Sequence, residues 1–208
     1  MAQAIEATKG FTRELPVAHS IDRSLVDKLI SWTGAVVAIA LLALGGAAIY
    51  GGSFALDNVR DRLAPQQISF PPLEAMSPEE QAEIGSFAGQ KVDTGTEAEA
   101  FSRYIGGHLA AVNDGKSYSE TSSESRGYAA EVGESPTAAE AAKMAELDGK
   151  VQTLFRGETL RAILLNAYGW WTVGQITFFA GIGMVIAGLL LAVFAGLGFW
   201  HARKATSV

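Results

Sequence analysis

The stretch that decides the fold is residues 162–200, AILLNAYGWWTVGQITFFAGIGMVIAGLLLAVFAGLGFW. It contains no charged side chain, and about 20 apolar residues are enough to cross a bilayer as an α-helix. Trp170 and Trp171 lie near one end, and Trp200 lies at the other end, just before a short basic tail. Aromatic residues at both interfaces with cations beyond one of them are typical of a membrane-spanning helix.

A second charge-free segment lies near the N-terminus, residues 29–56, LISWTGAVVAIALLALGGAAIYGGSFAL. A cleaved secretory signal has a short basic lead and an apolar core of about 7–15 residues. Here the polar lead occupies residues 1–28, and the apolar core is much longer than that of a signal peptide. We therefore expect a retained membrane helix rather than a cleaved signal.

The two apolar segments set the expected fold class, which is mainly α. Two transmembrane helices flank a small, mostly helical extracytoplasmic domain. The expected division is a cytoplasmic N-terminal tail at 1–28, transmembrane helix 1 at 29–56, the extracytoplasmic helical domain at 57–161, a juxtamembrane helix with transmembrane helix 2 at 162–200, and a cytoplasmic C-terminal tail at 201–208.

Cations close to the two segments predict the orientation. In short tails the Lys and Arg residues near the membrane decide which side stays inside, whereas long loops translocate largely regardless of charge. Arg23 and Lys28 precede the first segment, and Arg203 and Lys204 follow the second. We therefore expect a multi-pass protein of the plasma (inner) membrane with both tails cytoplasmic, although four arginines oppose this from the central region: Arg60, Arg62, Arg156 and Arg161.

Helix-start signals recur in the central region. A Ser or Thr followed three residues later by Glu forms a capping box, and this pattern begins at Ser77, Thr96 and Thr137. After the second box, apolar residues at helical spacing predict an amphipathic helix that ends at the Asn-Asp-Gly sequence of residues 113–115.

The remaining central residues are predicted as one loop and one long helix. Residues 116–135 are rich in Ser, Gly and Glu, which favours a mobile loop. From Thr137 onward apolar residues recur at helical spacing, interrupted only by Gly149 and Gly157. We expect one long or kinked helix that continues into the second membrane segment.

Composition argues against several functions. The central region holds 18 acidic against 10 basic residues, whereas nucleic-acid binding needs basic patches.

The chain has no cysteine, and the predicted topology places His108 across the membrane from His19 and His201. A zinc or iron site needs three or four converging ligands, and membrane-buried charges for a proton relay are absent from both segments. We therefore predict no catalytic, cofactor-binding or metal-binding residue, and no enzyme.

Small residues at every fourth position form a stripe on each membrane segment. The first stripe is Ala43, Ala47 and Gly51, and the second stripe is Gly188, Ala192 and Gly196. Such stripes let another helix approach closely, so we predict a helix-packing interface there. In an antiparallel hairpin the two stripes lie at different depths. One arrangement is that Gly34 and Ala38 of the first segment contact the second stripe, while Gly181 or Gly183 of the second segment contacts the first stripe. Otherwise at least one stripe remains as a smooth face for another membrane protein.

Three short sequences resemble small actinobacterial two-span membrane proteins of unestablished activity: FSRYIGGH at 101–108, GKSYSE at 115–120, and TLRA at 159–162 before the Gly-rich segment. The resemblance covers about residues 30–200 and implies two spans around an extracytoplasmic segment. Members are sometimes labelled aromatic ring-opening dioxygenases. That chemistry uses an iron site of two His and one carboxylate, which the histidines of this chain do not supply.

Two functions follow as predictions. The first is an integral membrane accessory or scaffold subunit, whose helices pack on another integral membrane protein or a larger complex, such as a respiratory-chain assembly. The alternative is a stand-alone membrane-anchored extracytoplasmic binding or sensing module, with a candidate outer binding surface formed by Phe101, Tyr104, Ile105 and His108. In both, the lipid bilayer is a partner and nucleic acid is not.

Overall fold

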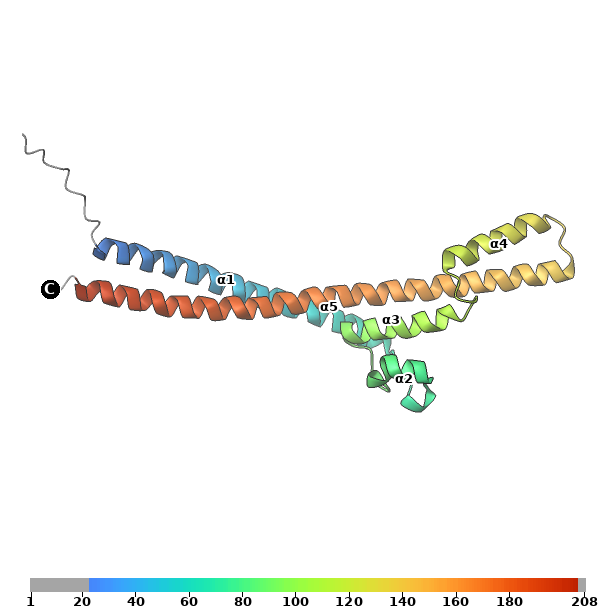
Figure 1. The fold of residues 1–208 in the computed structure, drawn as a ribbon, viewed down its shortest axis with the longest axis horizontal. Helices are drawn as coiled ribbons and strands as arrows, with labels where there is room; N and C mark the ends of the chain where they lie inside the picture. Colours follow the sequence, from blue (N-terminus) through green and yellow to red (C-terminus); the bar gives the residue numbers. More distant parts are fainter. Residues whose placement is uncertain (1–22, 206–208) are drawn as a thin grey trace, which may run out of the picture. The chain divides into compact units, whose positions relative to one another are not determined.

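Two long helices contain both apolar segments of the chain. The computed structural model describes residues 23–205, so His19 lies outside the described residues. Helix α1 spans Arg23–Leu63 and helix α5 spans Ala138–Ala205 (Figure 1). The long-helix prediction is confirmed, because α5 continues without interruption through Gly149 and Gly157.

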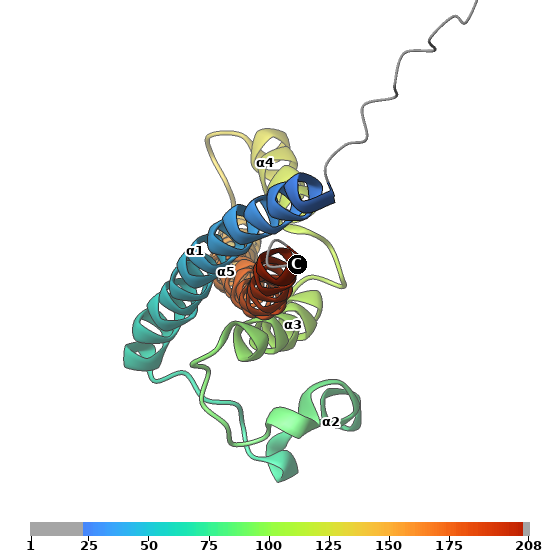
Figure 2. The same ribbon diagram turned by 90° about the vertical axis from the view of Figure 1, so that its left-hand side faces the viewer.

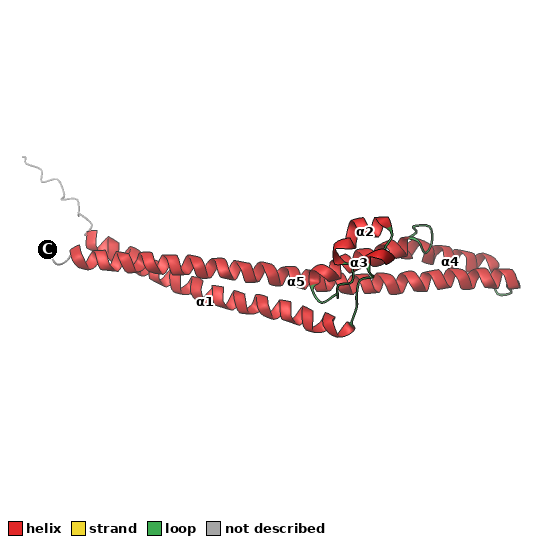
Figure 3. Ribbon diagram, turned by 90° about the horizontal axis from the view of Figure 1, so that it is seen from below, coloured by secondary structure: helices red, strands yellow, loops and turns green. Residues whose placement is uncertain are grey.

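The segment between the two long helices is built from short helices. In chain order they are η1 (Ala64–Gln66), η2 (Leu73–Ala75), α2 (Pro78–Ile84), η3 (Gly85–Phe87), α3 (Gly95–Ala110) and α4 (Tyr118–Val132). Among the described residues, extended pairing is limited to one bridge between Ser69 and Lys91, and Figure 3 is drawn entirely in helices and loops. The prediction of a mainly helical chain is confirmed.

Capping boxes begin four of the described helices, α2, α3, α4 and α5, and the sequence predicts the correct cap for two of them. Ser77 caps α2 together with Glu80, and Thr137 bonds Glu140 at the start of α5. For α3 the predicted box at Thr96 is wrong. Thr94 is the N-cap, because its hydroxyl accepts from the Glu97 backbone N–H and the Glu97 carboxylate accepts from the Thr94 backbone N–H. The pairs Thr94–Glu97 and Thr96–Glu99 both match the capping-box pattern, so the sequence alone does not show which threonine caps α3.

The predicted mobile loop at 116–135 is wrong, because α4 occupies most of it. Ser117 caps this helix with Glu120, and the helix ends at Gly133, whose φ of 74° suits glycine. The sequence of α4 contains few apolar residues, so it has no clear apolar periodicity that would predict a helix. The Ser117–Glu120 box was the available clue.

The described chain divides into two compact units. One unit joins α1 up to Leu42 with α5 from Ile186, and the other contains Ala43–Val185. In the larger unit, α3 lies beside α5 (Figure 2), and Arg161 of α5 donates to the Ser102 carbonyl oxygen of α3 at 3.1 Å.

A hydrophobic core forms in the larger unit where the end of α1, the connecting segment, α2, α3 and α5 meet. Its buried members are Val59, Leu63, Phe70, Met76, Ile84, Val92, Ala98, Ala100, Leu164 and Trp171. Trp171, which the sequence predicts in an interfacial aromatic belt, is 8% exposed in this core, whereas Trp170 is 59% exposed. A Cβ added to Gly95 would collide with Trp171, so glycine is required where α3 begins.

Candidate functional surfaces

Glycines bring α1 and α5 into close contact within the larger unit. A Cβ added to Gly45 would lie 2.9 Å from the Gly181 carbonyl oxygen, and one added to Gly52 would lie 2.6 Å from the Phe178 nitrogen. Gly174 faces the Gly52 carbonyl oxygen in the same way, at 3.2 Å. Because these neighbours are backbone atoms, they cannot turn aside, and only glycine permits this approach.

The smaller unit has a further contact between the same two helices. A Cβ on Gly34 would meet Ala195 at 3.6 Å, an ordinary van der Waals distance, and one on Gly188 would lie 3.2 Å from the Ala38 carbonyl oxygen. Gly34 and Ala38 therefore contact α5 here, with Gly188 of the second stripe among their neighbours.

Most residues of the two stripes lie outside these contacts. Gly188 is buried against α1, but the other five stripe residues are exposed: Ala43, Ala47 and Gly51 on α1, and Ala192 and Gly196 on α5. No other atom lies within 4 Å of a Cβ added to Gly51 or Gly196. The contact residues Gly45 and Gly52 lie on a different side of α1 from the first stripe, as their helical spacing requires.

The candidate outer binding surface is mostly turned inward. Phe101, Tyr104 and Ile105 are partly buried and pack against the hydrophobic core. Ring contacts run from Phe70 to Phe101, from Phe101 to Tyr104 and from Tyr104 to His108, with centroid separations of 5.2, 5.4 and 4.5 Å. Only His108 of the four is exposed, so the main role of the aromatic residues here is to hold α3 on the core.

His108 pairs with a carboxylate rather than with metal-ligating side chains. Its Nε2 lies 3.0 Å from the Glu80 Oε1, while the Glu80 Oε2 accepts from the Ser77 backbone N–H that begins α2. This pair links α3 to the first turn of α2. Within residues 23–205, no group of three or more His, Asp or Glu side chains is arranged to hold a metal ion.

A polar junction joins the α3–α4 turn to α4 and α5. The buried Asn113 amide donates to Thr121 Oγ1 at 3.0 Å and to Glu124 Oε2 at 3.3 Å, and its oxygen accepts from Lys150 Nζ at 3.2 Å. Hydrogen bonds from Lys116 and Asn113 lower the pKa of Glu124 below its ordinary value. Buried polar groups cost little when each has a partner, so this junction holds α4 in place without an apolar face.

Sequence reasoning missed this junction because its residues are far apart in the chain. The sequence predicts Asn113 only as part of a helix end, and Lys150 lies 37 residues further along the chain. The Ser117–Glu120 box was the one local sign that a helix begins beside Asn113.

No family model, no curated protein and no solved structure matches this chain. The resemblance to two-span actinobacterial proteins therefore stays a prediction.

Proposed function

We propose that this protein is an integral membrane accessory or scaffold subunit, with α1 and α5 as its two spans. Both helices are long and apolar enough to cross a membrane. A helix in a soluble core would bury its large apolar side chains. Here Ile39 is 67% exposed, Ile176 is 65% exposed and Phe194 is 67% exposed, so lipid is the natural cover for these side chains.

The close contact between the helices supports α1 as a retained span. A signal sequence that is cleaved is not expected to pack closely against a helix later in the chain. Gly45 and Gly52 of α1, however, oppose Gly181 and Gly174 of α5. Small residues at such crossings are the usual way for membrane helices to associate.

The observation that carries the accessory role is the exposed first stripe. Ala43, Ala47 and Gly51 offer a smooth surface that α5 does not use. Small-residue surfaces favour contact with another helix over contact with lipid, because the backbones come closer. The partner proposed is another integral membrane protein or a larger membrane complex, of which a respiratory-chain assembly is one example.

The proposed orientation keeps both tails in the cytoplasm. Lys28, Arg203 and Lys204 lie at the end of the helices that carries the chain termini, and cations in short tails favour the cytoplasmic side. The region between the spans is then extracytoplasmic, and the membrane is the plasma (inner) membrane. A reactive cysteine introduced at the exposed Gly127 of α4 tests this, because a membrane-impermeant maleimide should label it in intact cells.

Native gel electrophoresis in a mild detergent tests the accessory role. The wild-type chain should migrate with a larger assembly, and Gly51→Leu should release it as a small species, because a leucine side chain separates the helices. Gly46→Leu is the matched control, since Gly46 is also exposed on α1 but lies outside the stripe. Migration of the wild type as a free small species, or equal release by both variants, would contradict the proposal.

A further inference from the structure

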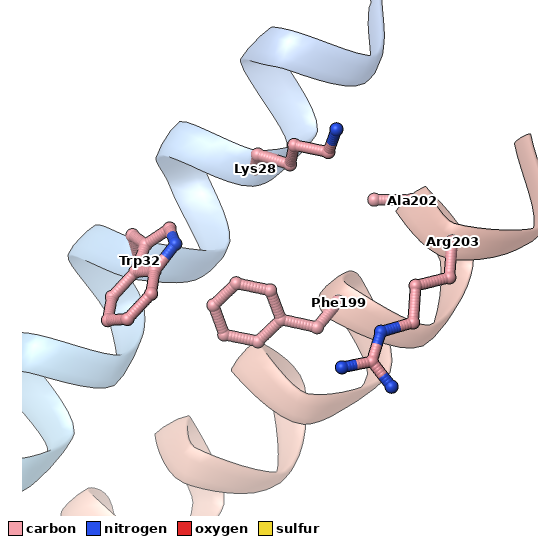
Figure 4. Close-up of a pocket in the computed structure, with 5 residues that line it drawn as sticks. All are labelled: Lys28, Trp32, Phe199, Ala202 and Arg203. Atoms are coloured by element: carbon pink, nitrogen blue, oxygen red, sulfur yellow. The ribbon is translucent and has the colours of Figure 1, made fainter. Parts of the chain in front are cut away.

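A groove lies between α1 and α5 within the smaller unit, near the chain termini. It has a volume of about 380 Å³ and is lined by Lys28, Trp32, Phe199, Ala202 and Arg203 (Figure 4). This volume is within the range of small-molecule sites. Lys28 and Trp32 come from α1, and the other three residues come from α5.

The groove has an apolar floor with a cation beside it on each helix. Trp32 and Phe199 meet edge to face, with ring centroids 5.6 Å apart. Lys28 precedes Trp32 by four residues, and Arg203 follows Phe199 by four residues, so each cation lies one helical turn toward the helix end from its aromatic neighbour. In Figure 4 the Lys28 side chain extends toward Ala202, whereas the Arg203 side chain turns back beside Phe199.

Both cations are available to a ligand. Neither Lys28 nor Arg203 forms an ion pair with a residue in the described part of the chain. Asp27 is the only acidic residue among the described residues of this unit, whereas Arg23, Lys28, Arg203 and Lys204 are basic. The groove therefore has an excess of positive charge.

We propose that this groove binds the anionic headgroup of a phospholipid, with Lys28 and Arg203 attracting its phosphate from the two helices and the rings contacting the start of the acyl chains. The inference rests on the proposed membrane insertion. An arginine guanidinium matches phosphate oxygens in two parallel hydrogen bonds, and a lysine adds a point charge. Basic pockets between membrane helices on the cytoplasmic side suit anionic lipids for this reason.

The aromatic floor favours a lipid over a water-soluble phosphate. A free phosphate would engage only the two cations and would leave Trp32 and Phe199 without a contact. A lipid uses both parts, because tryptophan rings favour the depth at which headgroups join acyl chains.

The test is native mass spectrometry of the full chain in detergent with equal amounts of phosphatidylglycerol and phosphatidylcholine of identical acyl chains. The wild type should bind phosphatidylglycerol in preference. Each cation near an anionic surface contributes enough to change binding about fivefold, so Lys28→Gln with Arg203→Gln should lower the phosphatidylglycerol preference about 25-fold. Lys204→Gln removes the same charge outside the groove lining and should change the preference less than twofold.

Three results would overturn the proposal: no preference in the wild type, an equal loss in Lys204→Gln, or full displacement of the lipid by excess inorganic phosphate. The second would indicate diffuse attraction, and the third a site for soluble anions. Resistance of each variant to alkaline carbonate extraction from membranes is measured in parallel. Loss of that resistance in the wild type would refute the membrane proposal itself, whereas retained insertion without lipid preference would refute only the groove.

Discussion

Gly149 and Gly157 of α5 should respond in opposite ways to the same change. In the sequence they are two equivalent interruptions of one helical pattern. In the structure a Cβ on Gly149 has no neighbour within 4 Å, whereas a Cβ on Gly157 would lie 2.7 Å from Leu109 Cδ1 and 2.9 Å from its Cγ. Replacing each with alanine therefore tests the contact between α3 and α5.

Two opposing free energies set the size of the effect. Alanine is favoured over glycine in a helix interior by about 0.5–1 kcal/mol, so Gly149→Ala should stabilise by that amount. Gly157→Ala has the same gain, but the buried Leu109 side chain must move, and overpacking costs about 1–3 kcal/mol. The two variants should differ in the free energy of unfolding by about 1–3 kcal/mol.

A double-mutant cycle isolates the contact. Leu109→Ala alone should cost about 2–5 kcal/mol, because it leaves a cavity. In that background Gly157→Ala should become stabilising, since the obstructing carbons are gone and the new methyl group fills part of the cavity. Urea denaturation of the full chain in detergent, followed by circular dichroism, measures all four proteins, and the coupling should be about 1–3 kcal/mol.

Equal stabilities for Gly149→Ala and Gly157→Ala would refute this reasoning. The reasoning would also be refuted if Gly157→Ala changed the free energy of unfolding by the same amount with Leu109 present and with alanine at position 109. Either result would mean that α3 does not rest on α5 at this point.

Three further predictions concern other contacts. Gly52→Ala should lower the thermal unfolding temperature in detergent, because the added Cβ meets backbone atoms of α5, while Gly46→Ala, in open space, should not. Thr94→Ala should cost about 1 kcal/mol in urea denaturation by removing the α3 cap, and an unchanged midpoint would contradict the cap assignment. The lowered pKa of Glu124 stabilises the fold at neutral pH, and this stability is lost as the pH falls through that pKa. Because Glu124→Gln lacks the ion pair with Lys116, its urea midpoint should fall less on acidification than that of the wild type.

Local signals in the sequence predicted the helices wherever an element depends mainly on its own residues. The capping boxes at Ser77 and Thr137 begin helices as expected, because both partners lie within one turn. Prediction failed for α4, since this helix is held by Asn113 and by the bond from Ser125 to Asp148 of α5, 23 residues away. A stretch of Ser, Gly and Glu has no apolar period to reveal such distant partners.

For the candidate surfaces, the sequence indicated that small residues form the helix contacts, but not which of the small residues do so. Small residues recur along both apolar helices, and four-residue spacing alone fits several faces equally well. The structure places Gly45 and Gly52 against α5 and leaves Ala43, Ala47 and Gly51 exposed.

The sequence by itself determined that two charge-free segments form helices long enough to cross a membrane, because length and apolarity are properties of a segment alone. Tertiary structure decided which of two adjacent tryptophans enters the core. Trp171 packs beneath α3 where Gly95 leaves room, and Trp170, 100° around the same helix, stays exposed. The reason is geometric. A helix directs neighbouring side chains to different sides, and only its partners determine which side is buried.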